Sequence, residues 1–339
     1  MNNQDVDALV AAANTNYTDP ERNRVINGEP GTQPRFELYH FALSLCSHKV
    51  RAVLDEKEAA YFSHDIDILP PGMQNYLPDY ARLRLAGGRD LGLVDRFVDG
   101  YTGRSSTESE GFDPLVVPTL VDRQAGKILV NSKRICLYLD DMLDTGAKLV
   151  PDDIADAVIR QADIVDRSPH PAVLYGAHPD GDGRPDFIRQ DMPGIHDRKI
   201  AEARMNLARA GADPLIVAAY EHKILKEAAA KAHVNTEAKM RASVQEFKDA
   251  VTTLERDLNA TGGTWLFGDR FTLADVFWGV SLFRLQWLGL GYLWKTDDRL
   301  ALPRVYEYSR RLFLRPSFSH AVVHWPGNPP SPHVMEYYA

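Results

Sequence analysis

The sequence predicts an α/β domain followed by an all-helical domain. In the first 146 residues, strand-like and helix-like segments follow one another in the order β-α-β and then β-β-α. A βαβ unit followed by a hairpin and a helix is typical of a small mixed sheet covered by helices. From about residue 150 the strand signals fade and apolar residues recur at helical spacing instead. A chain of 339 residues is long enough for two such domains.

Changes in composition predict the boundaries. Residues 1–34 end in a stretch rich in Gly, Pro, Asn and Thr, which is typical of an extension that is mobile or lies over the surface. The predicted α/β domain then spans 35–146, the predicted helical domain spans 150–325, and 326–339 form a tail. Within the first domain, the connection over about 70–113 is unusually long. Connections above roughly 12–15 residues often act as lids or binding loops.

The elements of the first domain each have a local signal. Aromatic and β-branched residues predict the strands, and apolar residues three or four positions apart predict the helices. The segment "RQAG" (123–126) predicts a hairpin turn. The expected strands are 36–41, 61–69, 116–122 and 127–130. The expected helices are "CSHKVRAVLDEK" (46–57), one helix within 75–85, and 132–143.

The second domain is expected to be entirely helical. In "FTLADV", Thr272 and Asp275 form a capping box, while Phe271 and Val276 form a hydrophobic staple. One interruption, about 168–200, is expected to be irregular. The segments with helical periodicity are 152–165, 214–234, 236–258, 272–289 and 302–318.

Composition excludes several classes of function. The net charge of −8 and the pI of about 5.8 disfavour a nucleic-acid partner and an anionic membrane surface. The start of the chain lacks the basic and apolar regions of a secretory signal. The apolar segment 276–294 contains Arg284 and Gln286, so it is expected to be a buried helix and not a membrane span. The two cysteines form neither a disulfide framework nor a zinc motif. We therefore expect a cytoplasmic protein with no metal.

Cys46 is the first candidate for chemistry. A helix that begins near Ser44 would place Cys46 in its first turn, where free N–H groups and the helix dipole favour an anion. Cysteines in this position ionise more readily than free thiols. A core role is the alternative, because unpaired cysteine is among the most buried residue types. Lys49 stands where a dithiol oxidoreductase would carry its second cysteine, and Cys136 lies on the apolar face of its own helix.

Two further positions point to a binding cleft. Pro118 interrupts the strand segment "VVPTLV", so it belongs at a sheet edge or in a cis bend. A cis bend would turn the backbone of Val117 outward, free to pair with an extended peptide. Ser132 opens the next helix, either as a simple N-cap or also as a dock for a carboxylate on free N–H groups.

Together these features resemble the glutathione S-transferase superfamily. The resemblance rests on a thiol at the first helix start, a strand proline before a hairpin, a serine opening the next helix, and "GDRFTLADVFW" in a helical domain. It covers about 36–69 and 113–325. The segments "PRFELYHFALSLCSHKVR" and "GFDPLVVPTLVD" are most similar to the glutathione-dependent hydroquinone dehalogenases, which use a cysteine. The resemblance implies a thioredoxin-like domain with an insertion at about 70–113, followed by a helical bundle.

The resemblance also implies a role for each site residue. Ser44 would stabilise the glutathione thiolate, and Cys46 would be a second nucleophile. Val117, before Pro118, would bind the peptide-like backbone of glutathione. Ser132 would hold its γ-glutamyl carboxylate, next to an asparagine at position 131 where many members carry an acidic residue or Gln.

The implied reaction is the reductive dehalogenation of chlorinated hydroquinones with glutathione as cosubstrate. A thiolate displaces halide, Cys46 removes the sulfur from the ring, and a second glutathione frees Cys46. Two alternatives remain at this point: another glutathione-dependent lyase, isomerase or transferase acting on aromatic-derived compounds, and a non-catalytic interaction module. The segment 167–175 is a candidate wall for the substrate, with Arg167, His170 and Tyr175 as candidate phenol partners or plain surface residues. A homodimer is expected by resemblance.

Overall fold

The sheet at the centre of the first domain has five strands in the order β1-β3-β2-β4-β5. The computed structural model describes residues 3–296, 299–329 and 331–338. β2 and β3 run parallel, and every other neighbouring pair is antiparallel. This is the mixed sheet that the β-α-β and β-β-α order predicts. The strands are β1 (Asn23–Ile26), β2 (Phe36–His40), β3 (Tyr61–Asp65), β4 (Thr119–Asp122) and β5 (Lys127–Val130).

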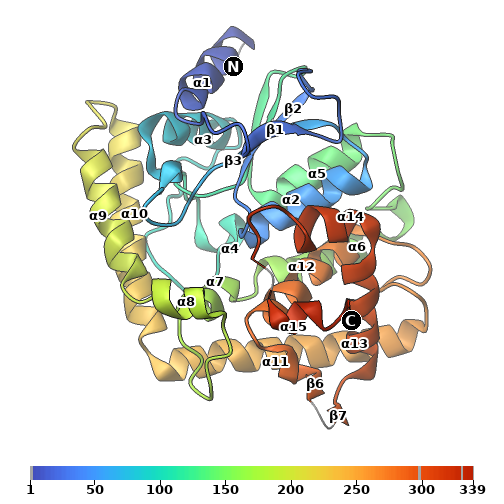
Figure 1. Cartoon of the computed structure of the whole chain (residues 1–339). Coiled ribbons are helices and arrows are strands. Elements are labelled where there is room, and N and C mark those ends of the chain that lie inside the picture. The colour runs from blue at the N-terminus through green and yellow to red at the C-terminus, as the bar shows by residue number, and fades with distance from the viewer. Residues whose placement is uncertain (1–2, 297–298, 330, 339) are drawn as a thin grey trace.

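Helices cover both faces of this sheet because its strands carry apolar residues on both sides. Leu38 and Leu120 belong to the core shared with α2 and α5, whereas their neighbours Tyr39 and Val121 belong to the core shared with α1 and α3. Figure 1 shows α1 and α3 on one side of the strands and α2 and α5 on the other. The helical elements of this half are α1 (Asn3–Asn14), α2 (Leu45–Glu56), η1 (Gln74–Tyr76), α3 (Pro78–Asp90), α4 (Thr107–Glu110) and α5 (Ser132–Met142).

The N-terminal segment is more ordered than its composition predicts. Residues 1–34 were expected to be mobile or to lie over the surface, but α1 and β1 both form within them. β1 pairs with β3 as an edge strand, and Val6, Val10 and Tyr17 are buried against α3 and the sheet. Of the two alternatives, the segment therefore lies over α3 and the sheet edge, and its buried apolar residues account for an order that the turn-forming residues between them do not predict.

The long connection also contains a structural element of the sheet domain. The helix expected within 75–85 is α3, which packs on β5 and so covers one face of the sheet. Only the segment after it, 91–113, is a long loop, and it carries the single short helix α4. The insertion is therefore smaller than the predicted 70–113.

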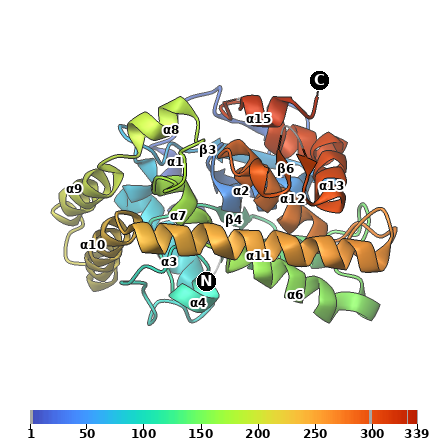
Figure 2. The same ribbon diagram turned by 90° about the horizontal axis from the view of Figure 1, so that it is seen from below.

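The second half is helical around one central helix, α12. All fifteen residues of α12 are buried, and it contacts α2, α6, α13 and α15. In Figure 2, α11 runs as one long helix from beside α10 across most of the width of the molecule. The α-helices of this half are α6 (Ala155–Asp166), α7 (His170–Tyr175), α8 (Asp186–Asp191), α9 (Ile195–Leu207), α10 (Pro214–Val234), α11 (Glu237–Thr261), α12 (Leu273–Trp287), α13 (Pro303–Leu314), α14 (Pro316–Phe318) and α15 (Pro332–Met335).

Shorter elements complete this half of the chain. The pair β6 and β7 forms a small antiparallel hairpin. The elements are η2 (Asp152–Ile154), η3 (Gly291–Leu293), β6 (Lys295–Thr296), β7 (Arg299–Leu300) and η4 (Ser319–Val323), which is one turn of π-helix.

Comparison with the predicted elements confirms the fold class and corrects two details. The α/β plus all-helical architecture is present, and all five helical segments predicted after residue 150 form helices. The interval 168–200, expected to be irregular, contains α7, α8 and the start of α9. The β6–β7 hairpin means that the second domain is not entirely helical. The capping box of Thr272 and Asp275 is present, with the Thr272 N–H donating to the carboxylate over 2.7 Å.

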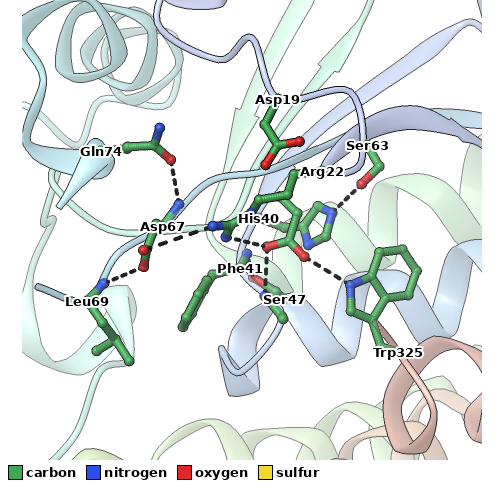
Figure 3. A network of polar contacts seen from close by, with 12 residues as sticks. Asp19, Arg22, His40, Phe41, Ser47, Ser63, Asp67, Leu69, Gln74 and Trp325 are labelled. Atoms are coloured by element: carbon green, nitrogen blue, oxygen red, sulfur yellow. Dashed lines mark hydrogen bonds and ion pairs between the residues drawn. The ribbon is translucent and has the colours of Figure 1, made fainter. Parts of the chain in front are cut away.

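Within the predicted tail α15 packs on α12, and Trp325, the residue just before the tail, contacts the sheet domain. Trp325 is buried, and its indole N–H donates to the Asp65 carboxylate over 3.1 Å. The other oxygen of Asp65 accepts the Ala42 N–H over 2.9 Å. Figure 3 shows Trp325 in the same polar network as Arg22, which lies next to β1, and His40 on β2. The C-terminal segment therefore holds the strand ends beside the start of α2.

Trp325→Phe is expected to lower the free energy of unfolding by about 1.5–3 kcal/mol, because a hydrogen bond to a charged acceptor is lost. Trp278→Phe is a matched control. Its buried indole N–H donates to the neutral Gln161 side chain over 2.9 Å, so about 0.5–1.5 kcal/mol is expected. Urea denaturation of both variants measures the difference, and equal losses would contradict the charged role of Asp65.

Candidate active site

The N-terminus of α2 presents a thiol together with free backbone donors. Ser44 is the N-cap in extended conformation, and its hydroxyl accepts the Ser47 N–H over 3.3 Å. Cys46 is the second residue of the helix and is half-buried. Among the residues that the structure describes, the N–H groups of Leu45 and Cys46 have no hydrogen-bond acceptor. The predicted arrangement at the helix start is confirmed, and the thiol is not enclosed in the core.

The helix that carries Cys46 contains no second cysteine that could form a disulfide with it. Lys49 is buried, and its ammonium forms an ion pair with Asp166 at 2.9 Å. Burial alone would lower the pKa of Lys49, but the Asp166 carboxylate outweighs it and the pKa is raised. Cys136 is completely buried, as predicted, and burial raises its pKa far above that of a free thiol. A disulfide formed at Cys46 therefore needs an external thiol to break it.

The loop before β4 supplies a free stretch of backbone. The Val117–Pro118 peptide is cis, as one of the two predicted alternatives requires. Within the described part of the chain, the Val117 main chain makes no turn, loop or cap hydrogen bond. Two residues of α3 fix this loop in place. Arg84 donates to the Pro118 carbonyl over 2.5 Å, and the Tyr80 hydroxyl donates to the Val116 carbonyl over 2.9 Å.

The start of α5 differs in one detail from the prediction. Ser132 does open the helix, but the N-cap is Asn131, whose side-chain oxygen accepts the Arg134 N–H over 3.1 Å. Asn131 has a φ of 75°, in the left-handed region that Asn tolerates better than most residues. The Ser132 hydroxyl is therefore not used as the cap.

One cavity of about 180 Å³ brings the predicted site residues together. Three different elements contribute them: the start of α2, the loop before β4 and the start of α5. Its lining includes all six of these residues, namely Ser44, Cys46, Val117, Pro118, Asn131 and Ser132.

The helical domain supplies the opposite wall of this cavity. Segment 167–175 does form part of this wall. His170 and Tyr175 on α7 line the cavity, whereas Arg167 does not and is the exposed surface residue of the other alternative. His170 contacts the Ser281 hydroxyl over 2.8 Å, and burial together with Lys49 holds its pKa well below the usual range. The remaining apolar lining on this side comprises Leu174, Ile188, Met192 and Trp287.

A cluster of buried charges borders another part of the cavity, and the sequence analysis missed it. Asp113 accepts from Lys223 over 2.8 Å and from Lys226 over 2.6 Å, and Lys223 also pairs with Glu227 at 2.9 Å. Lys199 lies 3.8 Å from Glu227. These contacts anchor the 91–113 loop to α10. No local pattern could reveal them, because Asp113 and Lys223 are 110 positions apart.

The described residues contain no group of His, Cys, Asp or Glu that could hold a metal ion. They also include no helix with the length and apolar character needed to cross a membrane. The site itself offers a half-buried thiol in a cavity with free backbone donors.

Comparisons with known proteins agree with this architecture. A family model described as "Glutathione S-transferase, C-terminal domain" matches residues 226–311. The chain is 50% identical over 317 residues to the 2,5-dichlorohydroquinone reductive dechlorinase of Sphingobium indicum, which covers 94% of this chain and 90% of that relative. It is 23% identical over 300 residues to the tetrachloro-p-hydroquinone reductive dehalogenase of Sphingobium chlorophenolicum, covering 87% of this chain and 99% of that relative.

A solved structure shares the fold at lower identity. The β-etherase LigF from Sphingobium sp. strain SYK-6 superposes with a TM-score of 0.55 and 16% identity, covering 85% of this chain and 98% of that one. At this identity the likeness concerns the fold alone.

Proposed function

This chain belongs to the glutathione S-transferase superfamily, in the family of the 2,5-dichlorohydroquinone reductive dechlorinases, and on that premise we propose that it reductively dehalogenates chlorinated hydroquinones with glutathione. One observation carries the proposal: a single cavity joins the Cys46 thiol to the backbone of Val117 and the start of α5. The start of α2 with Cys46 fits the sulfur of glutathione, the Val117 backbone fits its peptide groups, and the start of α5 fits its γ-glutamyl end. The 50% identity over most of both chains supports the choice of substrate class.

Glutathione is held as an extended peptide across three elements. The free main chain of Val117 pairs with its cysteinyl residue, and Ser132 with the N–H groups of α5 binds the γ-glutamyl carboxylate. Its sulfur then lies at the start of α2, where the Ser44 hydroxyl donates a hydrogen bond to the thiolate. Backbone N–H groups at this helix end favour the negative charge.

The reaction then proceeds in three balanced steps. The glutathione thiolate attacks the halogenated ring carbon, and chloride leaves with the bonding electron pair. The Cys46 thiolate next attacks the sulfur of the conjugate, so that the ring carbon takes the electron pair and a proton and a mixed disulfide forms. A second glutathione thiolate attacks the glutathione sulfur of this disulfide and frees Cys46. Two thiols are oxidised to one disulfide, and the ring is reduced by two electrons.

The products of one incubation test this function. With glutathione and 2,5-dichlorohydroquinone, we expect chloride and glutathione disulfide in equal amounts, with two glutathione molecules consumed per chloride. An isomerase, or any other enzyme that uses glutathione catalytically, would return it unchanged. A non-catalytic module would release no chloride above the buffer control. Either result would overturn the proposal.

Ser132→Ala is expected to raise the KM for glutathione at least about tenfold, because a hydrogen bond to a charged group is worth about 1.5–3 kcal/mol. The change leaves the helix cap intact, since Asn131 supplies it. Ser132→Thr retains a hydroxyl and is the matched control. Initial rates over a glutathione series measure the effect, and an unchanged KM in the alanine variant would remove Ser132 from the binding site.

We also infer that the protein acts as a cytoplasmic homodimer joined through its helical domain. The inference is supported by membership of the superfamily. Sedimentation equilibrium of the purified chain distinguishes a dimer from a monomer.

A further inference from the structure

Arg284 is a buried cation whose hydrogen-bonding capacity is largely unused. It lies on α12 and is only 3% exposed. Its one hydrogen bond to the described residues joins Nη2 to the Leu43 carbonyl, although a guanidinium has five N–H donors. Its Nε is buried without an acceptor, and no carboxylate of the described residues lies within ion-pair distance. Burial lowers its pKa to about 10, so it keeps its charge at neutral pH.

Three other buried cations of this protein find their partners within the chain. Lys49 and Lys223 each pair with a buried carboxylate. Arg51 lacks a carboxylate, but its guanidinium donates to the main-chain oxygens of Phe41, Ala42 and Ala321 and contacts the His40 ring. A buried charge without such partners costs several kcal/mol. We therefore expect a bound ligand to supply the missing hydrogen-bond acceptor of Arg284.

The position of Arg284 limits what this ligand is. Arg284 lines the same cavity as Cys46 and interacts electrostatically with Cys46 and Tyr175. The Trp287 ring also lines this cavity, and its centroid lies 5.5 Å from the guanidinium carbon. The lining further includes the apolar side chains of Leu174 and Met192. A guanidinium with unused donors beside a tryptophan ring fits a flat aromatic ring that carries one anionic oxygen.

We propose that Arg284 binds the ring oxygen of the aromatic substrate as a phenolate and thereby seats the halogenated ring against Cys46. The proposal rests on the proposed function for the identity of the substrate, and it adds the residue that selects a ring bearing an ionised hydroxyl. Arg284 is then a specificity-determining residue, since a halogenated ring without that hydroxyl gains nothing from the guanidinium.

A purely structural role makes a different prediction. Through the Leu43 carbonyl, Arg284 also supports the segment that leads into Ser44. If this support were its only role, its loss would weaken glutathione binding and would affect charged and neutral aromatic ligands equally.

Binding of two matched probes separates these roles. 4-Nitrophenol absorbs visible light only as its phenolate, whereas 4-nitroanisole has nearly the same shape and cannot ionise. For Arg284→Met we expect 4-nitrophenolate binding to weaken roughly 10- to 100-fold, the range expected for a hydrogen bond to a charged group, with 4-nitroanisole binding unchanged. Arg284→Lys keeps the charge and should recover part of the loss. Equal weakening of both probes, or of neither, would overturn the proposal.

Kinetics give a second, independent test. In Arg284→Met, kcat/KM for the chlorohydroquinone should fall roughly 10- to 100-fold while the KM for glutathione stays within about twofold. A raised glutathione KM with an unchanged aromatic kcat/KM would overturn the phenolate role. If the wild-type chain released no chloride at all, the proposed function would fail, but the probe titration would still decide whether Arg284 binds a phenolate. Circular dichroism of each variant confirms that it is folded.

Discussion

Cys46→Ser is expected to stop the release of reduced hydroquinone and to accumulate the glutathionyl hydroquinone. The first displacement needs only the glutathione thiolate, so one chloride should still be released for each conjugate formed. The conjugate then has no internal thiolate to remove its sulfur, because a serine hydroxyl stays protonated at neutral pH. We expect the steady-state rate of reduced product to fall by roughly 10³-fold or more, within the range seen when a covalent nucleophile is removed.

Cys136→Ser is the matched control for this experiment. Cys136 is completely buried on α5 and does not line the cavity, so the folded fraction should keep its activity per molecule. Mass spectrometry of the products and of the intact protein measures both outcomes, since the wild type should also carry a glutathione adduct at Cys46 during turnover. A Cys46→Ser enzyme that turns over normally would show that external glutathione cleaves the conjugate.

Asp113→Asn is expected to lower the free energy of unfolding by about 3–5 kcal/mol, the cost of breaking a buried ion pair from one side. Asp113 neutralises Lys223 and Lys226, and its other oxygen accepts the Leu115 N–H over 2.9 Å. Asp197→Asn is the matched control on neighbouring helices. Asp197 pairs with Lys231 at 2.8 Å, but both side chains are exposed, so at most about 1 kcal/mol is expected. Urea denaturation measures the two losses, and similar values would contradict the role of burial.

The same ion pairs predict a loss of stability in acid. Burial alone would raise the pKa of Asp113, but Lys223 and Lys226 outweigh it and hold the pKa well below the unfolded value of about 4. A carboxylate with a lowered pKa stabilises the fold above its unfolded pKa, and this contribution is lost as the pH falls through the folded pKa. Unfolding free energy should therefore decline below about pH 5, and less steeply in Asp113→Asn. Parallel declines in both proteins would show that other carboxylates cause the acid sensitivity.

We expect the loss of Asp113 also to disturb the cavity that contains Cys46. Asp113 ends the 91–113 loop, and its ion pairs attach that loop to α10 at the border of the cavity. The same loop end is held from the sheet side, since Arg84 donates to the Asp113 carbonyl over 3.3 Å. The cavity therefore depends on contacts that join the insertion to both domains.

Some elements of the site were predictable because their causes are local. The capping box at Thr272, the start of α5 at Ser132 and the position of Cys46 in the first turn of α2 each depend on residues within a few positions in the chain. Periodicity of apolar residues likewise predicted α10 over its full length. The secondary structure of residues 3–34 was not predictable in this way, because turn-forming residues lie between apolar residues that are buried only by α3 and the sheet.

Sequence by itself determined the order of elements from β2 to α5, the bounds of helices such as α10 and the position of the thiol, because hydrogen bonding and side-chain spacing along a short segment decide them. Tertiary structure alone decided which residues surround that thiol. Arg284 and Leu43 are 241 positions apart, and Arg84 and Pro118 are 34 apart. The charge of Arg284 is fixed by its chemistry, but its burial without a carboxylate partner among the described residues arises only when the two domains pack together and exclude water from it.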